Sequence, residues 1–216
     1  MNRITKVAGF TLSLLIGGRN AMAVEEAPYR ILEKEGAIEL REYAPQILAE
    51  VIVDGSLEDA GNKAFNLLFR YISGDNRTRA KIAMTAPVSQ KSAPPEPIAM
   101  TTPVGQQSAP GGWAVSFMMP SSFTMETLPE PTDPQVALRA IPARHVAAIR
   151  YSGTWSESRY RKNRIHLEAW LGKRSLTATG DPVWARYNPP FTPWFLRRNE
   201  VLIPIATPKT VPAHAL

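Results

Sequence analysis

The sequence predicts an α+β domain in which an antiparallel sheet rolls into a barrel and two helices pack outside it. Segments with strand character outnumber helical ones, and several follow one another through short turns. Two segments show the apolar period of an amphipathic helix. A repeat relates residues 46–74 to residues 144–172 at an offset of 98 positions. The two halves therefore predict a pseudo-two-fold domain, each half supplying strands and one helix.

The two predicted helices occupy matching places in the repeat. In each copy a strand runs into a glycine, Gly55 or Gly153, and a helix start follows. Ser56 with Asp59, and Thr154 with Glu157, have the spacing of a helix-capping pair. The first helix is expected over residues 57–72 and the second over residues 155–171. The core stripe of the first helix comprises Leu57, Gly61, Ala64, Phe65, Leu68 and Ile72.

Strand candidates lie around both helices. A second, shorter repeat falls among them: residues 82–90 match residues 98–106 at seven of nine positions. Each copy is apolar and contains a proline, which cannot donate to a β-ladder, so each reads as a strand or strand end. The block has no histidine, cysteine or acid, and we expect no chemistry from it. The candidates are residues 29–32, 38–43, 47–53, 81–88, 113–118, 136–141, 146–151, 183–187 and 200–204.

Composition and the first residues limit the function classes. The 216 residues include no cysteine, which excludes disulfides, thiol nucleophiles, iron–sulfur clusters and covalent haem attachment. A basic start, an apolar run over residues 7–18 and Ala21-Met22-Ala23 predict a secretory signal peptide of residues 1–23, the alternative being an uncleaved anchor. Its cleavage removes three cations and no acid, so the net charge falls from +6 to +3. That charge gives no reason to expect a nucleic-acid partner.

The expected mature protein is a single domain of residues 24–205 with a flexible tail of residues 206–216. It would be periplasmic or secreted, without a stable membrane span after cleavage of the signal peptide. No metal-spaced histidine pair, nucleophile elbow or phosphate loop is present, so no catalytic residue is predicted.

Four segments carry a resemblance to a known family. They are residues 38–45 (IELREYAP), residues 71–76 leading into 81–88, residues 116–121 (SFMMPS) and residues 187–201 (YNPPFTPWFLRRNEV). In this order they resemble the SOUL family of haem-binding proteins. The resemblance implies one domain, a distorted antiparallel β-barrel of about eight strands flanked by two α-helices. It also implies non-covalent binding of haem or a related tetrapyrrole in a hydrophobic groove, as a carrier, buffer or sensor.

Carried over residue by residue, the resemblance names six candidate cofactor-binding residues. The first helix offers Phe65 and Phe69 to pack against the macrocycle and Arg70 to bind a propionate, although Phe65 also belongs to the core stripe. The second wall would be the loop of residues 188–198. It contributes Phe191, Trp194 and Arg197, unless its prolines merely stiffen a connection whose aromatic residues cap the barrel.

The residues leave the iron ligand and the ligand class open. Glu42 stands where some relatives have a proposed histidine ligand, and carboxylates are poor haem-iron ligands. His145, His166 and His214 read better as structural or solvated residues, so binding would rest on packing and charge or on a methionine or tyrosine. Two other functions remain: a general binding module for small apolar ligands, and an enzyme that modifies tetrapyrroles.

Overall fold

A computed structural model describes residues 24–92, 112–189 and 191–208, and the statements below concern these residues. They form eleven strands, two α-helices and one 3-10 helix. The expected signal peptide, the second copy of the short repeat and most of the expected tail lie outside them. The elements in chain order are β1 (Glu25–Glu26), β2 (Tyr29–Glu35), β3 (Ile38–Tyr43), β4 (Gln46–Val53), α1 (Leu57–Ile72), β5 (Thr85–Ala86), β6 (Val88–Ser92), β7 (Trp113–Met118), β8 (Ala137–Ile141), β9 (Arg144–Tyr151), α2 (Glu157–Lys173), β10 (Val183–Arg186), η1 (Trp194–Leu196) and β11 (Asn199–Ile205).

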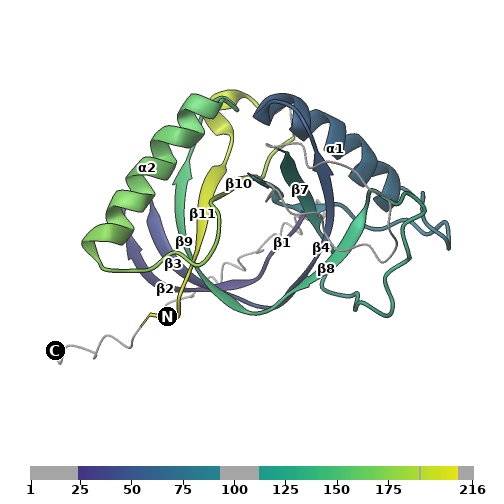
Figure 1. Cartoon of the computed structure of the whole chain (residues 1–216), viewed down its shortest axis with the longest axis horizontal. Coiled ribbons are helices and arrows are strands. Elements are labelled where there is room, and N and C mark those ends of the chain that lie inside the picture. The colour runs from purple at the N-terminus through teal and green to yellow at the C-terminus, as the bar shows by residue number, and fades with distance from the viewer. Residues whose placement is uncertain (1–23, 93–111, 190, 209–216) are drawn as a thin grey trace, which may run out of the picture.

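Nine strands form one curled antiparallel sheet in the order β2-β3-β9-β11-β10-β6-β7-β4-β8. β1 and β5 make a separate two-stranded parallel pair. The predicted α+β class, antiparallel sheet and two flanking helices are confirmed. Within the described residues the sheet is an open half-barrel with β2 and β8 at its edges, as Figure 1 shows.

The strand order displays the predicted pseudo-two-fold relation. One half of the sheet contains, from its edge to the centre, β8, β4, β7 and β6. In the same order these correspond to β3, β9, β11 and β10 of the other half, and β6 pairs with β10 at the centre of the sheet. The halves also exchange a strand. β3 precedes β4 in sequence but pairs with β9, whereas β8 precedes β9 but pairs with β4. This exchange ties the halves into one domain.

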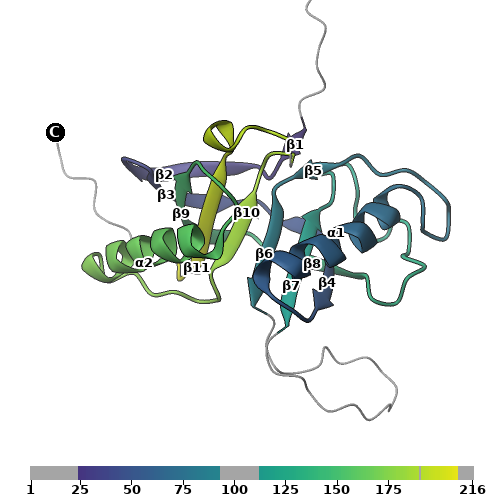
Figure 2. The same ribbon diagram turned by 90° about the horizontal axis from the view of Figure 1, so that it is seen from above.

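Each helix covers one half of the sheet on its outer face (Figure 2). α1 packs on β4 and β7, and α2 packs on β9 and β11. The predicted stripe of α1 faces the sheet: Ala64 and Leu68 are fully buried, Gly61 and Ile72 are buried, and Phe65 is partly buried. Burial of these apolar side chains is what holds the helix, because an isolated helix of this length is marginal in water.

Two expectations were wrong in detail. Residues 81–88 do not form one strand: the chain is irregular from residue 81, forms β5, and starts β6 after Pro87. Pro87 has no N–H to continue the ladder, which explains the break. α2 begins at Glu157, because the backbone stays extended through its N-cap Ser156, which makes no side-chain capping bond. Thr154 and Glu157 therefore do not act as a capping pair, whereas Ser56 accepts a bond from the Asp59 N–H at 3.1 Å as predicted.

Candidate functional site

A groove beside α1, with a volume of about 590 Å³, is the candidate site and is called the α1 groove below. Three segments far apart in the sequence form its walls: α1, residues 84–90, and residues 186–189 with Phe191. Its lining is mostly apolar, with a few amide and guanidinium groups, which is typical of small-molecule sites. The lining residues are Val24, Gly61, Asn62, Phe65, Asn66, Met84, Thr85, Ala86, Val88, Gln90, Val115, Trp155, Arg186, Tyr187, Asn188, Pro189 and Phe191.

The α1 wall depends on one small residue and one aromatic residue. At Gly61 a Cβ atom would lie 3.2 Å from Nη2 of Arg186, so the lack of a side chain keeps the floor of the groove open. One turn later, the ring of Phe65 lines the groove and meets the ring of Phe117 edge-on, with centroids 5.3 Å apart. Phe65 is thus both a core residue and a groove residue, and both readings of its sequence pattern hold.

The second wall is the first copy of the short repeat. Ile82 is buried in the core under α1, Met84 faces the groove, and Thr85 is fixed by donating its hydroxyl to the carbonyl of Met118. β6 then extends the wall through Val88 and Gln90. The sequence analysis expected no chemistry from this block, and the structure places its thioether, Met84, in the lining of the groove.

The third wall is the turn after β10. Asn188 accepts a hydrogen bond from the N–H of Arg198 at 2.6 Å, which closes the base of the 188–198 loop. Phe191 extends from this loop over the groove and is 86% exposed.

Two guanidinium groups stack on Trp155, a lining residue of the groove; Arg186 also lines the groove, whereas Arg197 does not. The Cζ atoms of Arg186 and Arg197 lie 5.4 Å and 4.3 Å from the Trp155 ring centroid. Arg186 Nη2 donates to the side-chain oxygen of Gln90 at 2.7 Å, and Arg197 Nε donates to the Thr192 carbonyl at 2.7 Å. These contacts hold the Arg186 cation in the lining of the groove and the Arg197 cation against the Trp155 ring.

The six predicted residues do not all line the groove. Phe65 and Phe191 do. Phe69 stacks on Phe65 with centroids 5.9 Å apart and is 49% exposed, so it extends the aromatic wall by one turn. Arg70 is exposed and paired with Asp75, whose pKa is lowered by hydrogen bonds from Thr132 and Arg70.

Trp194 and Arg197 follow Phe191 on the 188–198 loop. Trp194 is 55% exposed and meets the ring of Phe195 edge-on. Arg197 does not line the groove but stacks on Trp155, which does. The sequence reasoning did not identify Gly61, Met84 or Arg186. His145 pairs with Glu42 and Ile205 in the sheet, and His166 lies on the exposed face of α2, so neither lines the groove.

A buried charge network anchors the loop. The Glu200 carboxylate is fully buried and accepts bonds from Arg41 at 2.7 and 3.0 Å, from Tyr187 at 2.8 Å and from Arg198 at 3.0 Å. Burial, reinforced by the charge of Glu200, raises the pKa of the Tyr187 hydroxyl, which therefore remains protonated and donates to Glu200. The network joins β3 and β11 to Tyr187, directly after β10, and to Arg198 at the end of the loop, and so fixes both ends of the third wall.

The described part of the chain contains neither a candidate metal-binding cluster nor a candidate membrane-spanning helix. No group of three histidine or acidic side chains is arranged to hold a metal ion there. Its helices are also too short or too polar to cross a membrane.

Comparison with known families decides the classification. The sequence pattern described as SOUL heme-binding protein matches residues 24–204. The chain belongs to the SOUL family. Heme-binding protein 1 of Xenopus tropicalis is 28% identical over 171 residues, which cover 78% of this chain and 84% of that protein. The resemblance seen in the four sequence segments is thus confirmed.

Solved structures share the fold at low identity. The EcmrR C-terminal domain matches with a TM-score of 0.58 and 11% identity, over 82% of this chain and 98% of that one. An uncharacterized conserved protein from Listeria innocua matches with a TM-score of 0.52 and 12% identity, over 78% of this chain and 92% of that one. At such identities the likeness extends to the fold only.

Proposed function

We propose that this SOUL-family chain binds haem or a related tetrapyrrole non-covalently in the α1 groove. The observation that carries the proposal is the groove itself: an apolar cavity of about 590 Å³ whose walls come from the segments that the family resemblance points to. This volume lies within the range of roughly 300–1,000 Å³ of small-molecule sites. Membership of a family described as heme-binding supports a tetrapyrrole as the occupant.

The residues present fit such a group. Phe65, Val88 and Phe191 would pack against the faces of the macrocycle, and Arg186 and Arg197 would bind its propionates. Among the described lining residues Met84 carries the side chain best suited to ligate the iron, because the Tyr187 hydroxyl is already bonded to Glu200. When bound, haem would supply a redox-active iron. The chain itself contributes packing, charge and a single soft ligand.

The exposure of the groove favours a reversible role as carrier, buffer or sensor. Phe191 is 86% exposed, so the ligand would remain accessible on one side, as transfer to another protein requires. We also propose that the protein works outside the cytoplasm after cleavage following Ala23, which rests on the signal-peptide pattern.

The test is a hemin titration followed by the Soret band. Gly61→Leu adds a side chain at the floor of the groove and should weaken binding about tenfold or more. Leucine also favours the helix over glycine, so the variant should fold. Gly172→Leu on α2 is the matched control: no atom lies within 4 Å of its Cβ position, and binding should be unchanged. Equal binding by Gly61→Leu and wild type would refute the site.

Three further variants separate the named contacts. Met84→Leu should keep most of the affinity but change the Soret position, because it removes the candidate ligand and preserves the shape. Arg197→Met should weaken binding, whereas Arg70→Met tests the sequence-based candidate that is already paired with Asp75. A loss in Arg70→Met without a loss in Arg197→Met would move the propionate site to the far end of α1. Saturable binding of another apolar ligand in place of hemin would favour the general binding module.

A further inference from the structure

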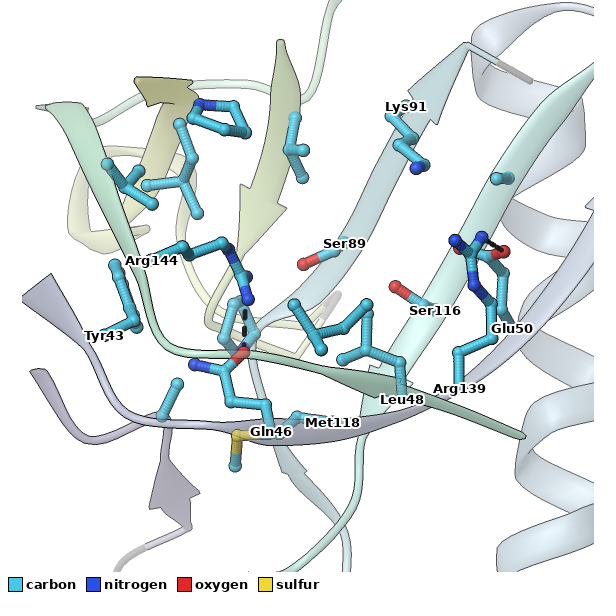
Figure 3. A pocket seen from close by; sticks show the side chains of 18 of the residues that line it. Tyr43, Gln46, Leu48, Glu50, Ser89, Lys91, Ser116, Met118, Arg139 and Arg144 are labelled. Atoms are coloured by element: carbon cyan, nitrogen blue, oxygen red, sulfur yellow. Dashed lines mark hydrogen bonds and ion pairs between the residues drawn. The ribbon is translucent and has the colours of Figure 1, made fainter. Parts of the chain in front are cut away.

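A second cavity, called the central cavity below, lies on the other face of the sheet where the two halves meet (Figure 3). Its volume is about 200 Å³. Successive residues of a strand point to opposite faces, so β4 directs Ala49 and Val51 into the core under α1 and Gln46, Leu48 and Glu50 into this cavity. Residues of β3, β6, β7, β8, β9, β10 and β11, together with Ala27 and Pro87, complete the lining.

Two hydrogen-bond donors in the cavity have no partner. Nη2 of Arg144 donates to the side-chain oxygen of Gln46 at 3.4 Å, but Arg144 Nη1 and Gln46 Nε2 are buried and unpaired among the described residues. Such donors are uncommon in folded proteins, because water or a ligand normally satisfies them. Gln46 and Arg144 occupy equivalent places in the long repeat, so this pair of donors joins the two halves.

The charge in the cavity is predominantly positive. Lys91, Arg139 and Arg144 face it, and Glu50 is the one carboxylate among its described lining residues. Glu50 forms an ion pair with Arg139, with its Oε1 atom 2.6 Å from Nη1 of Arg139. The positive charges of Lys91 and Arg144 are therefore not neutralised within the cavity, and Figure 3 shows both side chains directed toward the space between the halves.

The remaining lining combines two hydroxyls with apolar walls. Ser89 and Ser116 are partners across β6 and β7, and both face the cavity. Apolar side chains, including Leu48, Met118 and Leu202, form the walls beside them. A purely inorganic anion would leave these walls in contact with water, whereas an anion with an apolar body would cover them.

We propose that the central cavity binds a small organic monocarboxylate, with its carboxylate held by Arg144 and Gln46 and its apolar body against Leu48 and Met118. The unpaired donors Arg144 Nη1 and Gln46 Nε2 would each give a hydrogen bond to an oxygen of the carboxylate. The volume is well below that of sites for drug-sized molecules, which excludes a tetrapyrrole. Burial also lowers the pKa of Arg144 by withdrawing its charge from water, and an anion would offset that loss.

The experiment is calorimetric titration of the haem-free protein with benzoate, benzamide and inorganic phosphate. Benzoate should bind saturably. Benzamide has the same shape but no charge, and phosphate has the charge but no apolar body, so each should bind at least about tenfold more weakly. Benzamide binding as tightly as benzoate would overturn the carboxylate assignment. Tighter binding of phosphate would assign the site to phosphates instead, and no binding of any probe would refute the proposal.

Variants locate the binding. Arg144→Met should weaken benzoate binding about tenfold or more, and Arg161→Met is the matched control because Arg161 is exposed on α2 and paired with Glu157. If Arg144→Met does not fold, Ser89→Leu fills the cavity from a partly exposed position and should abolish binding. Unchanged benzoate binding in the folded variants would refute the site.

The two proposed sites are tested independently. Gly61→Leu should lose hemin binding and keep benzoate binding, and Ser89→Leu should show the reverse. Failure of one proposal therefore leaves the other measurable.

Discussion

Replacing Glu200 by glutamine removes the charge at the centre of the buried network while preserving its shape. Glutamine offers one acceptor oxygen in place of two, and its NH2 group would face the donors of Arg41 and Arg198. Arg41, only 2% exposed, would retain one carboxylate partner, Glu39, with Oε2 2.8 Å from its Nη2. Breaking a buried ion pair from one side costs roughly 3–5 kcal/mol, because the remaining charge stays buried.

For a domain of this size that loss corresponds to a fall in Tm of roughly 6–20 °C. The assay is urea unfolding, because urea is uncharged and does not screen the ion pairs as guanidinium salts do. The midpoint should fall with an unchanged m-value. Glu42→Gln is the control: its pair with Arg30 is exposed, and the midpoint should stay the same. A free energy of unfolding for Glu200→Gln within about 1 kcal/mol of wild type would refute the reasoning.

The same network predicts the direction of the pH dependence. Burial alone would raise the pKa of Glu200, but the hydrogen bonds and charge of Arg41 and the charge of Arg198 outweigh it and hold the pKa below its ordinary value. A lowered folded-state pKa gives stabilisation that is fully present above the unfolded value of about 4.3 and is lost as the pH falls through the folded value. Glu200→Gln should therefore lose less stability than wild type when both are acidified below about pH 4.

Three further predictions concern the fold and processing. Leu68→Ala should cost roughly 2–5 kcal/mol in urea unfolding, because its side chain is fully buried under α1, whereas Ile165→Ala on the exposed face of α2 should leave the midpoint unchanged. Ser56→Ala should lower the free energy of unfolding by about 1 kcal/mol, because it removes the N-cap of α1. Thr154→Ala should remove no cap, because α2 starts beyond residue 154. Equal losses of stability in the two variants would contradict the helix boundaries. Exported protein should have an intact mass that corresponds to a chain starting after Ala23, and a retained leader would contradict the signal-peptide prediction.

The pattern of apolar and polar residues within each segment was sufficient to predict most of the helices and strands. The apolar stripe from Gly61 to Ile72 predicts a helix over residues 57–72, which is the extent of α1. Strands β3 and β7 also have their predicted bounds, and both bury residues on both faces of the sheet. The residue pattern within a strand does not identify the strand beside it. The exchange of β3 and β8 between halves therefore could not be predicted, since residues 136–141 and 144–151 look like the two arms of one hairpin.

Only some of the groove residues could be predicted, because the sequence pattern of a segment does not show which strands lie beside it. Phe65 and Phe191 line the groove where the family resemblance places them. Gly61 could have been found as a glycine inside a core stripe, which often marks a close approach of another group. Arg186 could not, because its place follows from the pairing of β10 with β6. The Arg41–Glu200 contact is likewise invisible in either segment alone, since 159 positions separate the two residues.

The two halves explain why the groove forms beside α1 and not beside α2. Buried residues match between the helices at a shift of 99 positions, one more than the offset of the sequence repeat: Leu68, Tyr71 and Ile72 correspond to Leu167, Trp170 and Leu171. The same shift makes Gly61 correspond to Tyr160.

Strand register gives the second correspondence. Gln90 pairs with Val115, Trp184 pairs with Val201, and the two strands meet with Gln90 opposite Trp184. In the α2 half the rings of Tyr160 and Trp184 stack with centroids 5.6 Å apart and fill the space. In the α1 half a glycine and an amide stand at those positions and leave it open. The groove thus exists because two side chains differ between halves that share the same framework. A leucine at Gly61 should therefore close it.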